Sequence, residues 1–145
     1  MQIVEMTVDK VNEYADVFCK AFAAEPWNES WTKEHAVKRL KGVIEVPRFF
    51  GLSAVDKGRV LGFICGYREQ NYDGIQFCVQ EFCTDAVLQG RGIGSALLKA
   101  LYEALASEDI KHIYLITVRG EKTEGYYKSK GFSLSDKMIV MEKSI

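Results

Sequence analysis

A glycine-rich turn that runs straight into a long helix constrains this chain more than any other feature. Residues 81–105 are EFCTDAVLQGRGIGSALLKALYEAL, in which Gly90, Gly92 and Gly94 occupy every second position. After Gly94, apolar residues recur at spacings of three and four, as in a helix that buries one face on a sheet. The first N–H groups of a helix lack internal partners and carry partial positive charge. The turn therefore predicts an anion site, above all for a phosphate.

The residues of the turn narrow the kind of phosphate compound. Glycine lets backbone amides approach an anion without a Cβ in the way, and Arg91 adds a positive charge with a fork of donors. A P-loop needs Lys followed by Ser or Thr after its last glycine, and this chain has no such Lys. A dinucleotide motif counted from Gly90 needs Gly or Ala where Ser95 stands. Both nucleotide motifs fit poorly, and a purely structural strand-to-helix turn is the alternative to an anion site.

The length and composition predict one globular domain. The 145 residues suffice for one core, and no repeat, low-complexity tract or linker divides them, so we expect a single domain over 1–145. A net charge of −1 lacks the electrostatic signature of a nucleic-acid-binding protein. No apolar run approaches the roughly 20 residues of a membrane span, and the N-terminal MQIVEMTVDK lacks the segments of a signal peptide. We therefore expect a cytoplasmic protein that binds neither nucleic acid nor membrane.

The cysteines and histidines do not predict a metal site. Four cysteines occur without a C-x-x-C pair, and the only two histidines, His35 and His112, are distant from them in the sequence. These residues supply no ligand set for a structural zinc ion. We expect free thiols in a reduced compartment and no metal cofactor.

Hydrophobic periodicity predicts an α/β (α+β) domain. Helices are expected at 11–22, at 33–46 with Thr32 as N-cap, and at 93–107. Residues 121–143 predict a short helix, a turn at Gly131 and one or two closing strands. Because both hairpins and helical crossovers occur, the sheet should be mixed. The other strands are expected at 2–8, 49–55, 60–67, 75–84 and 112–118.

Two sequence blocks resemble a known family. Residues 89–94, QGRGIG, are similar to the acetyl-CoA signature Q/R-x-x-G-x-G/A of the GNAT N-acetyltransferase superfamily. Residues 126–132, YYKSKGF, are similar to the family's second block, F-Y-x-x-x-G-F. The order of elements also fits, so the resemblance covers nearly the whole chain. It implies a mixed, mostly antiparallel sheet of six or seven strands flanked by about four helices, in the order β-α-α-β-β-β-α-β-α-β-β.

The resemblance implies a reaction and a set of binding residues. An acetyl group would pass directly from acetyl-CoA to an amine, and the strands flanking the glycine helix would splay apart to admit pantetheine. Tyr127 would protonate or stabilise the departing thiolate. Many members carry an Asn near Gly120 and an Ala near Thr123, which this chain lacks, so the resemblance does not extend to one side-chain contact with coenzyme A. The residues implied to hold coenzyme A are Phe82, Cys83, Thr84, Gln89, Gly90, Arg91, Gly92, Ile93, Gly94 and Ser95.

Glu81 is the predicted general base. An alkyl amine has a reference pKa of about 10.4, so it must lose a proton before it attacks. Period-two alternation would place Glu81 on the same strand face as Phe77, Val79 and Cys83, where burial should raise its pKa. A raised pKa suits a base, whereas the alternative is a solvated residue at a strand end. For Tyr127 the alternative to a catalytic role is core packing, with its hydroxyl satisfied inside the protein.

The segment AEPWNESW, residues 24–31, is the predicted acceptor wall. In the family this region lines the acceptor pocket. Two tryptophan faces with Glu25 and Glu29 nearby could hold an ammonium group by cation–π and ionic contacts, although the tryptophans could instead cap the core. Tyr72 and Asp73 would line the opposite wall. The predicted substrate-binding residues are Trp27, Asn28, Glu29, Trp31 and Tyr72.

The catalytic residues favour an enzyme over a binding module. An N-acetyltransferase acting on a primary amine uses both Glu81 and Tyr127, whereas a catalytically inactive acyl-CoA sensor or interaction module of the same fold needs neither. A nucleotide-binding domain would bind ATP or NAD better than coenzyme A. Polyamines, aminoglycosides, amino acids and peptide N-termini all remain open as acceptors, and a small molecule is favoured because no long acidic groove is evident. Members of the family are often dimers, so a homodimer is compatible with the resemblance.

Overall fold

A computed structural model describes residues 1–145, and its centre is one sheet of five strands. The strands lie side by side in the order of the sequence. The first four pair antiparallel and the fifth pairs parallel with the fourth, so the sheet is mixed, as predicted. The strands are β1 (Gln2–Glu5), β2 (Phe49–Asp56), β3 (Arg59–Asn71), β4 (Gly74–Thr84) and β5 (Ile113–Leu115).

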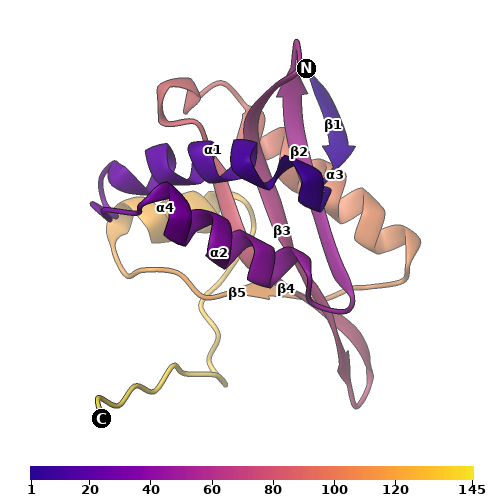
Figure 1. The fold of residues 1–145 in the computed structure, drawn as a ribbon. Helices are drawn as coiled ribbons and strands as arrows, with labels where there is room; N and C mark the ends of the chain where they lie inside the picture. Colours follow the sequence, from indigo (N-terminus) through magenta and orange to yellow (C-terminus); the bar gives the residue numbers. More distant parts are fainter.

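Four α-helices accompany the sheet, in the number predicted. They are α1 (Val11–Ala23), α2 (Lys33–Ile44), α3 (Ile93–Ser107) and α4 (Glu121–Ser129), and the 3-10 turns η1 (Val8–Lys10) and η2 (Ala86–Leu88) precede α1 and α3. Figure 1 shows α1 and α2 on one face of the sheet and α3 on the other. None of these helices combines the length and apolar character needed to cross a membrane.

Each face of the sheet has its own hydrophobic cluster. Tyr14, Phe18 and Leu40, from α1 and α2, are almost completely buried in the first cluster. Leu97 and Leu101, from α3, are fully buried in the second. These residues recur at helical spacing in the sequence, which is why periodicity alone predicted the helices that cover the sheet.

A β-bulge in β4 decides which way Glu81 points. The register between β3 and β4 shifts there, which leaves Gln80 as an extra residue between Val79 and Glu81. Phe77 and Val79 pack in the cluster of α3, whereas Cys83 packs in the cluster of α1 and α2. The prediction that Glu81 shares a face with all three was wrong, because an extra residue reverses the alternation beyond it. Glu81 faces α2 together with Cys83.

The C-terminal part departs from the predicted topology. The order of elements is the expected one as far as α4, but the expectation of six or seven strands is wrong, and β5 spans three residues rather than 112–118. After Gly131, at φ +91°, the chain leads away from the sheet without regular structure (Figure 1). Met138, Ile139, Val140 and Met141 are exposed there. Apolar composition favours a strand, but a strand also needs a neighbour for its backbone hydrogen bonds, and this tail has none.

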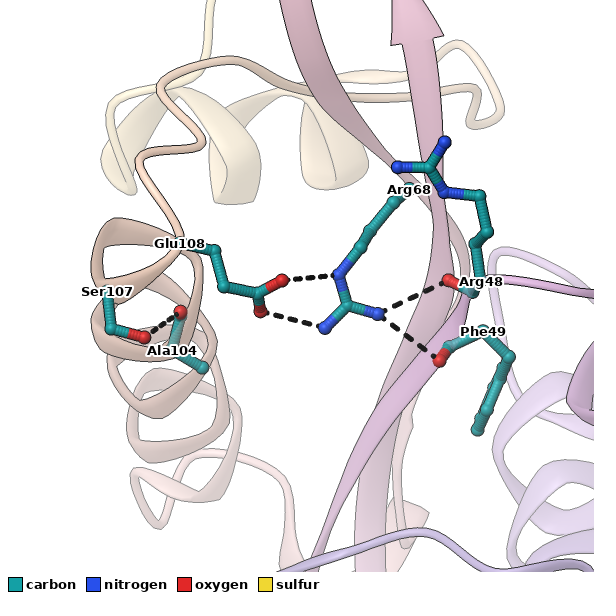
Figure 2. Close-up of polar contacts among 6 residues, drawn as sticks. All are labelled: Arg48, Phe49, Arg68, Ala104, Ser107 and Glu108. Carbon is teal, nitrogen blue, oxygen red and sulfur yellow. Dashed lines mark hydrogen bonds and ion pairs between the residues drawn. The ribbon is translucent and has the colours of Figure 1, made fainter.

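An arginine clamp fixes the C-terminal end of α3 on the sheet. Figure 2 shows Arg68 of β3 binding both carboxylate oxygens of Glu108, the residue that caps α3, with both nitrogen–oxygen distances at 2.7 Å. The third guanidinium nitrogen donates to the carbonyl oxygens of Arg48 and Phe49 at 3.4 Å. The hydrogen bonds from Arg68 lower the pKa of Glu108. The clamp orients α3, whose other end is the glycine turn.

Candidate active site

Two left-handed backbone positions build the glycine turn. Gly90 has φ +82° and Gly92 has φ +80°, and Gly92 is the N-cap of α3. Residues with a Cβ rarely adopt this conformation, so the turn requires glycine at both positions. A Cβ built on either residue would meet no heavy atom within 4 Å. The turn is therefore open on the side where these Cβ atoms would lie.

The turn presents a continuous row of unpaired donors. None of the seven backbone N–H groups from Gln89 to Ser95 donates a hydrogen bond within the protein, and the first helical bond runs from the Ala96 N–H to the Gly92 carbonyl at 3.0 Å. The side chain of Ile93 is buried in the cluster of α3, so this residue offers only its backbone. Unpaired amides at a helix N-terminus fit an anion such as a diphosphate. The N–H groups that the prediction assigned to the diphosphate are therefore free to bind it.

An ion pair between a buried carboxylate and an exposed arginine, absent from the prediction, fixes the entrance to the turn. The carboxylate of Asp85 is 3% exposed and accepts from Arg59 Nη2 at 2.6 Å and from the Val87 N–H at 3.0 Å. Arg59 also lines a hollow of about 540 Å³ together with Lys57 and Arg91. Asp56 is the one carboxylate in the lining, so cations outnumber it beside the turn and favour an anion there. Asp is a preferred cap of helical turns, and that preference was the signal available in the sequence.

Lys130 brings a further positive charge to the N-terminus of α3. Its Nζ donates to Ser95 Oγ at 2.6 Å and lies 5.5 Å from the ring centroid of Tyr126. A Cβ on Gly94 would lie 2.7 Å from the Tyr126 hydroxyl oxygen, so the third glycine of the turn allows α4 to pack closely against α3. Lys130 belongs to the second motif block, yet its role in the turn was missed because the motif gives no distance between α3 and α4.

The edge of β4 that faces β5 is open beyond Val79. Pairing with β5 covers Phe77 to Val79 only, so β4 from Gln80 onward has no strand on that side. The Cys83 carbonyl oxygen points the other way, toward β3, where it would lie 2.8 Å from a Cβ on Gly62.

Backbone groups of successive strand residues alternate in direction, so Phe82 and Thr84 present theirs to the open edge. Of the three strand residues predicted to hold coenzyme A, Phe82, Cys83 and Thr84, only two have their backbone groups at this edge. Phe82 and Thr84 can pair with an extended ligand at the open edge, whereas the backbone of Cys83 cannot, because it faces β3.

Tyr127 lies beside this open edge. Its ring is half-buried against Phe82, Tyr126 and Phe132, with centroid distances of 6.4, 5.3 and 5.5 Å. Burial raises the pKa of Tyr127, with smaller contributions from Tyr126 and Cys83, and no hydrogen bond occupies the hydroxyl. The ring packs as the alternative supposed, but the hydroxyl is not satisfied inside the protein. It remains protonated at neutral pH and free to donate.

Glu81 is buried two residues before Cys83 on β4. Its side chain is 5% exposed, and burial raises its pKa, although a hydrogen bond and charge from Arg39 oppose the rise. Arg39, on α2, binds Glu81 Oε1 through its Nε. The raised pKa is as predicted, and Arg39 was missed because its position on the helix surface is typical of a solvated charge. Glu81 directly precedes Phe82, the residue at the open edge of β4 against which the Tyr127 ring packs.

The predicted acceptor segment connects α1 and α2 on the same side as Glu81. Trp27 packs edge-on against Phe22 and Trp31 against Phe18, each with centroids 5.0 Å apart, so Trp31 caps the core and Trp27 packs at its periphery. Trp31 also has a second set of contacts. Its Nε1 donates to Glu29 at 2.8 Å.

The ring of Trp31 faces the Arg39 guanidinium at 5.6 Å. Trp31 therefore connects Glu29 with Arg39, the partner of Glu81, while Asn28 is exposed at φ +49° and Trp27 packs on Phe22.

Tyr72 does not line the acceptor side, which corrects the prediction. It lies with Asp73 at the tip of the hairpin between Asn71 and Gly74 and is 95% exposed. The tip is about 20 Å along β4 from Glu81 at the usual rise per residue. Figure 1 shows this hairpin projecting from the sheet, away from the loop between α1 and α2. Loop residues give no sequence signal for the direction in which a long hairpin extends.

Comparisons with known proteins agree with this architecture. Residues 12–132 match the model of the acetyltransferase (GNAT) family. A possible acetyltransferase from Clostridium difficile 630 has a similar structure, with a TM-score of 0.83, 17% identity, and coverage of 99% of this chain and 97% of that one. No sequence among the curated proteins matches the chain.

Two further solved structures share the fold at low identity. A ribosomal-protein-alanine N-acetyltransferase from Brucella melitensis biovar Abortus 2308 has a TM-score of 0.76 at 16% identity, covering 99% of this chain and all 100% of that one. An aminoglycoside acetyltransferase from an uncultured soil metagenomic sample has a TM-score of 0.75 at 12% identity, with coverage of 99% and 95%. At these identities the structures establish the fold alone.

Proposed function

Because the chain belongs to the acetyltransferase (GNAT) family, we propose that it transfers an acetyl group from acetyl-CoA to a primary amine of a small-molecule acceptor. Transfer is direct, with both substrates bound in one ternary complex. Family membership supports the acyltransferase class, and the residues of the site support the choice of acetyl-CoA and of an amine.

The row of unpaired N–H groups from Gln89 to Ser95 carries the proposal. These donors receive the diphosphate of acetyl-CoA, and Arg91 and Lys130 add positive charge on either side of the turn. The pantetheine arm pairs with the backbone of Phe82 and Thr84 as a short additional strand would. Its thioester then lies near Tyr127, which adjoins the same strand.

Glu81 and Tyr127 divide the proton transfers. Bound acetyl-CoA supplies the acyl group as a thioester. Glu81 takes a proton from the ammonium group of the acceptor, directly or through water, and its raised pKa suits this exchange. The amine nitrogen then bonds to the carbonyl carbon as the carbon–sulfur bond breaks, and the surplus proton on the new amide nitrogen is released to solvent. Tyr127 donates its proton to the departing sulfur and regains one from solvent.

Thiol release from acetyl-CoA tests the proposed function. Purified protein is incubated with acetyl-CoA and a panel of polyamines, aminoglycosides, amino acids and peptides, and free coenzyme A is measured against an amine-free control. Amine-dependent release supports the transferase. Tight binding of coenzyme A without turnover of any amine would instead favour an acyl-CoA sensor, and stronger thermal protection by ATP or NAD would contradict the cradle.

A further inference from the structure

Arg39 approaches Glu81 in a way that leaves most of its donors unused. Its Nε binds one carboxylate oxygen, and its two terminal nitrogens donate to no group of the protein. The ring of Trp31 holds the guanidinium at 5.6 Å. The Arg39 side chain is 48% exposed, whereas Glu81 is 5% exposed. The free donors therefore lie between solvent and the predicted base.

The clamp between Arg68 and Glu108 provides a comparison within the same protein (Figure 2). There the guanidinium binds both carboxylate oxygens, and its remaining nitrogen reaches two backbone carbonyls, so every nitrogen is used. Arg39 instead engages Glu81 through one nitrogen and one oxygen. A structural ion pair gains most from two-point contact. The one-point contact leaves a free carboxylate oxygen and a free donor fork side by side.

We propose that Arg39 binds a carboxylate of the acceptor, and hence that the acceptor is a small amine with a carboxylate near its amino group, as in amino acids. This inference rests on the proposed function. The ammonium group lies against the free oxygen of Glu81, close to Glu29, which Trp31 Nε1 holds at 2.8 Å. The carboxylate of the acceptor molecule accepts hydrogen bonds from the two terminal nitrogens of Arg39, in the planar geometry that guanidinium groups favour.

Charge also separates this class of acceptor from the others. Polyamines and aminoglycosides are polycations without a carboxylate, so their additional ammonium groups would be repelled by the Arg39 guanidinium. An amino acid carries one charge of each sign, which matches the fork of Arg39 beside the acidic pair of Glu81 and Glu29. Glu29 is linked to Glu81 through Trp31 and Arg39, because Trp31 donates to Glu29 and its ring faces the guanidinium that binds Glu81.

Matched acceptors test the assignment. Glycine, alanine, leucine and phenylalanine are each compared with their own carboxamides and with spermidine, by thiol release from acetyl-CoA. The wild type should use the acids with kcat/KM about tenfold or more above the carboxamides, the value of a charge-assisted contact. Arg39→Gln should slow every acceptor, because Glu81 loses its partner, but should bring the acid-to-carboxamide ratio close to one. Arg39→Lys, which keeps the charge without the fork, should give an intermediate ratio.

Lys38→Gln is the matched control, since it removes an exposed cation from the neighbouring position of α2 and should keep the wild-type ratio. A ratio near one in the wild type overturns the inference while the proposed function stands. The inference is also overturned if Arg39→Gln keeps the wild-type acid-to-carboxamide ratio, or if spermidine is acetylated faster than every amino acid. If no amine of any class is acetylated, the proposed function fails and this inference fails with it.

Discussion

Replacing Gly92 with alanine tests two roles of this residue separately: its left-handed backbone conformation, and the space it leaves open for the diphosphate. The backbone there is at φ +80°, where any residue with a Cβ is strained by about 1–2 kcal/mol. For a domain of this size, that strain lowers the Tm by about 3–8 °C. The added methyl group meets no protein atom within 4 Å, so it causes no clash within the protein. We therefore expect Gly92→Ala to fold with a modest loss of stability.

The larger effect of Gly92→Ala should fall on coenzyme A. The methyl group occupies the open side of the turn, next to the unpaired N–H groups of residues 89–95. Displacing the diphosphate from one charge-assisted hydrogen bond costs about 1.5–3 kcal/mol. The Kd for coenzyme A should then rise about 10- to 100-fold, and the branched side chain of Gly92→Val should raise it further.

Isothermal titration calorimetry with coenzyme A, together with thermal unfolding, measures both effects. Gly74→Ala is the control, because Gly74 is also at positive φ, +143°, with no atom within 4 Å of its Cβ, and lies at the tip of the β3–β4 hairpin. The control should lower the Tm without changing the Kd. If Gly92→Ala lowers the Tm as expected but binds coenzyme A with the wild-type Kd, the diphosphate does not lie on this turn and the reasoning is refuted.

Three further variants test the catalytic groups and the clamp. Tyr127→Phe should lower kcat about 10²-fold or more and leave the Kd for coenzyme A unchanged, and an unaltered kcat would remove Tyr127 from the mechanism. Burial raises the pKa of Glu81, so kcat/KM of the wild type should fall as the pH drops through a value above the ordinary one of about 4.3. Glu81→Gln should lower kcat and abolish that acidic limb; a limb that persists would assign it to another group. The lowered pKa of Glu108 means that its stabilisation is present above pH about 4.3 and is lost as the pH falls through the lowered value. Because this carboxylate is 39% exposed, Glu108→Gln should cost less than about 1 kcal/mol at neutral pH and nothing in strong acid, as judged by urea unfolding, and an equal loss at both pH values would contradict the clamp.

The glycine turn could be located from the sequence because its constraints are local. Gly90 and Gly92 adopt left-handed conformations that other residues avoid, and α3 begins at Ile93, as the apolar spacing predicted. The four helices and the mixed sheet follow from the same periodicities. Placement of Glu81 and Tyr127 on the candidate site needed the motif blocks as well, since a strand glutamate and a helix tyrosine have ordinary structural explanations.

The features that sequence reasoning missed depend on contacts between distant segments. The extra residue Gln80 reverses the alternation of β4, and the signal for it lay on the partner strand, where the register shifts at Gly66 and a Cβ would clash with the Cys78 carbonyl group. Arg39 lies 42 residues before Glu81, so its contact is set by the packing of α2 on the sheet rather than by any local pattern. Tyr72 was misplaced because the reach of a hairpin depends on strand length and twist. The closing strands were expected from apolar composition, which carries no information about a pairing partner.

A crystal structure with coenzyme A bound tests the central claim most directly. The account predicts diphosphate oxygens within hydrogen-bonding distance of the backbone N–H groups between Gln89 and Ser95, with pantetheine along the open edge of β4 at Phe82 and Thr84. Coenzyme A bound with its diphosphate elsewhere on the protein, and with those amides left in contact with solvent, would contradict it.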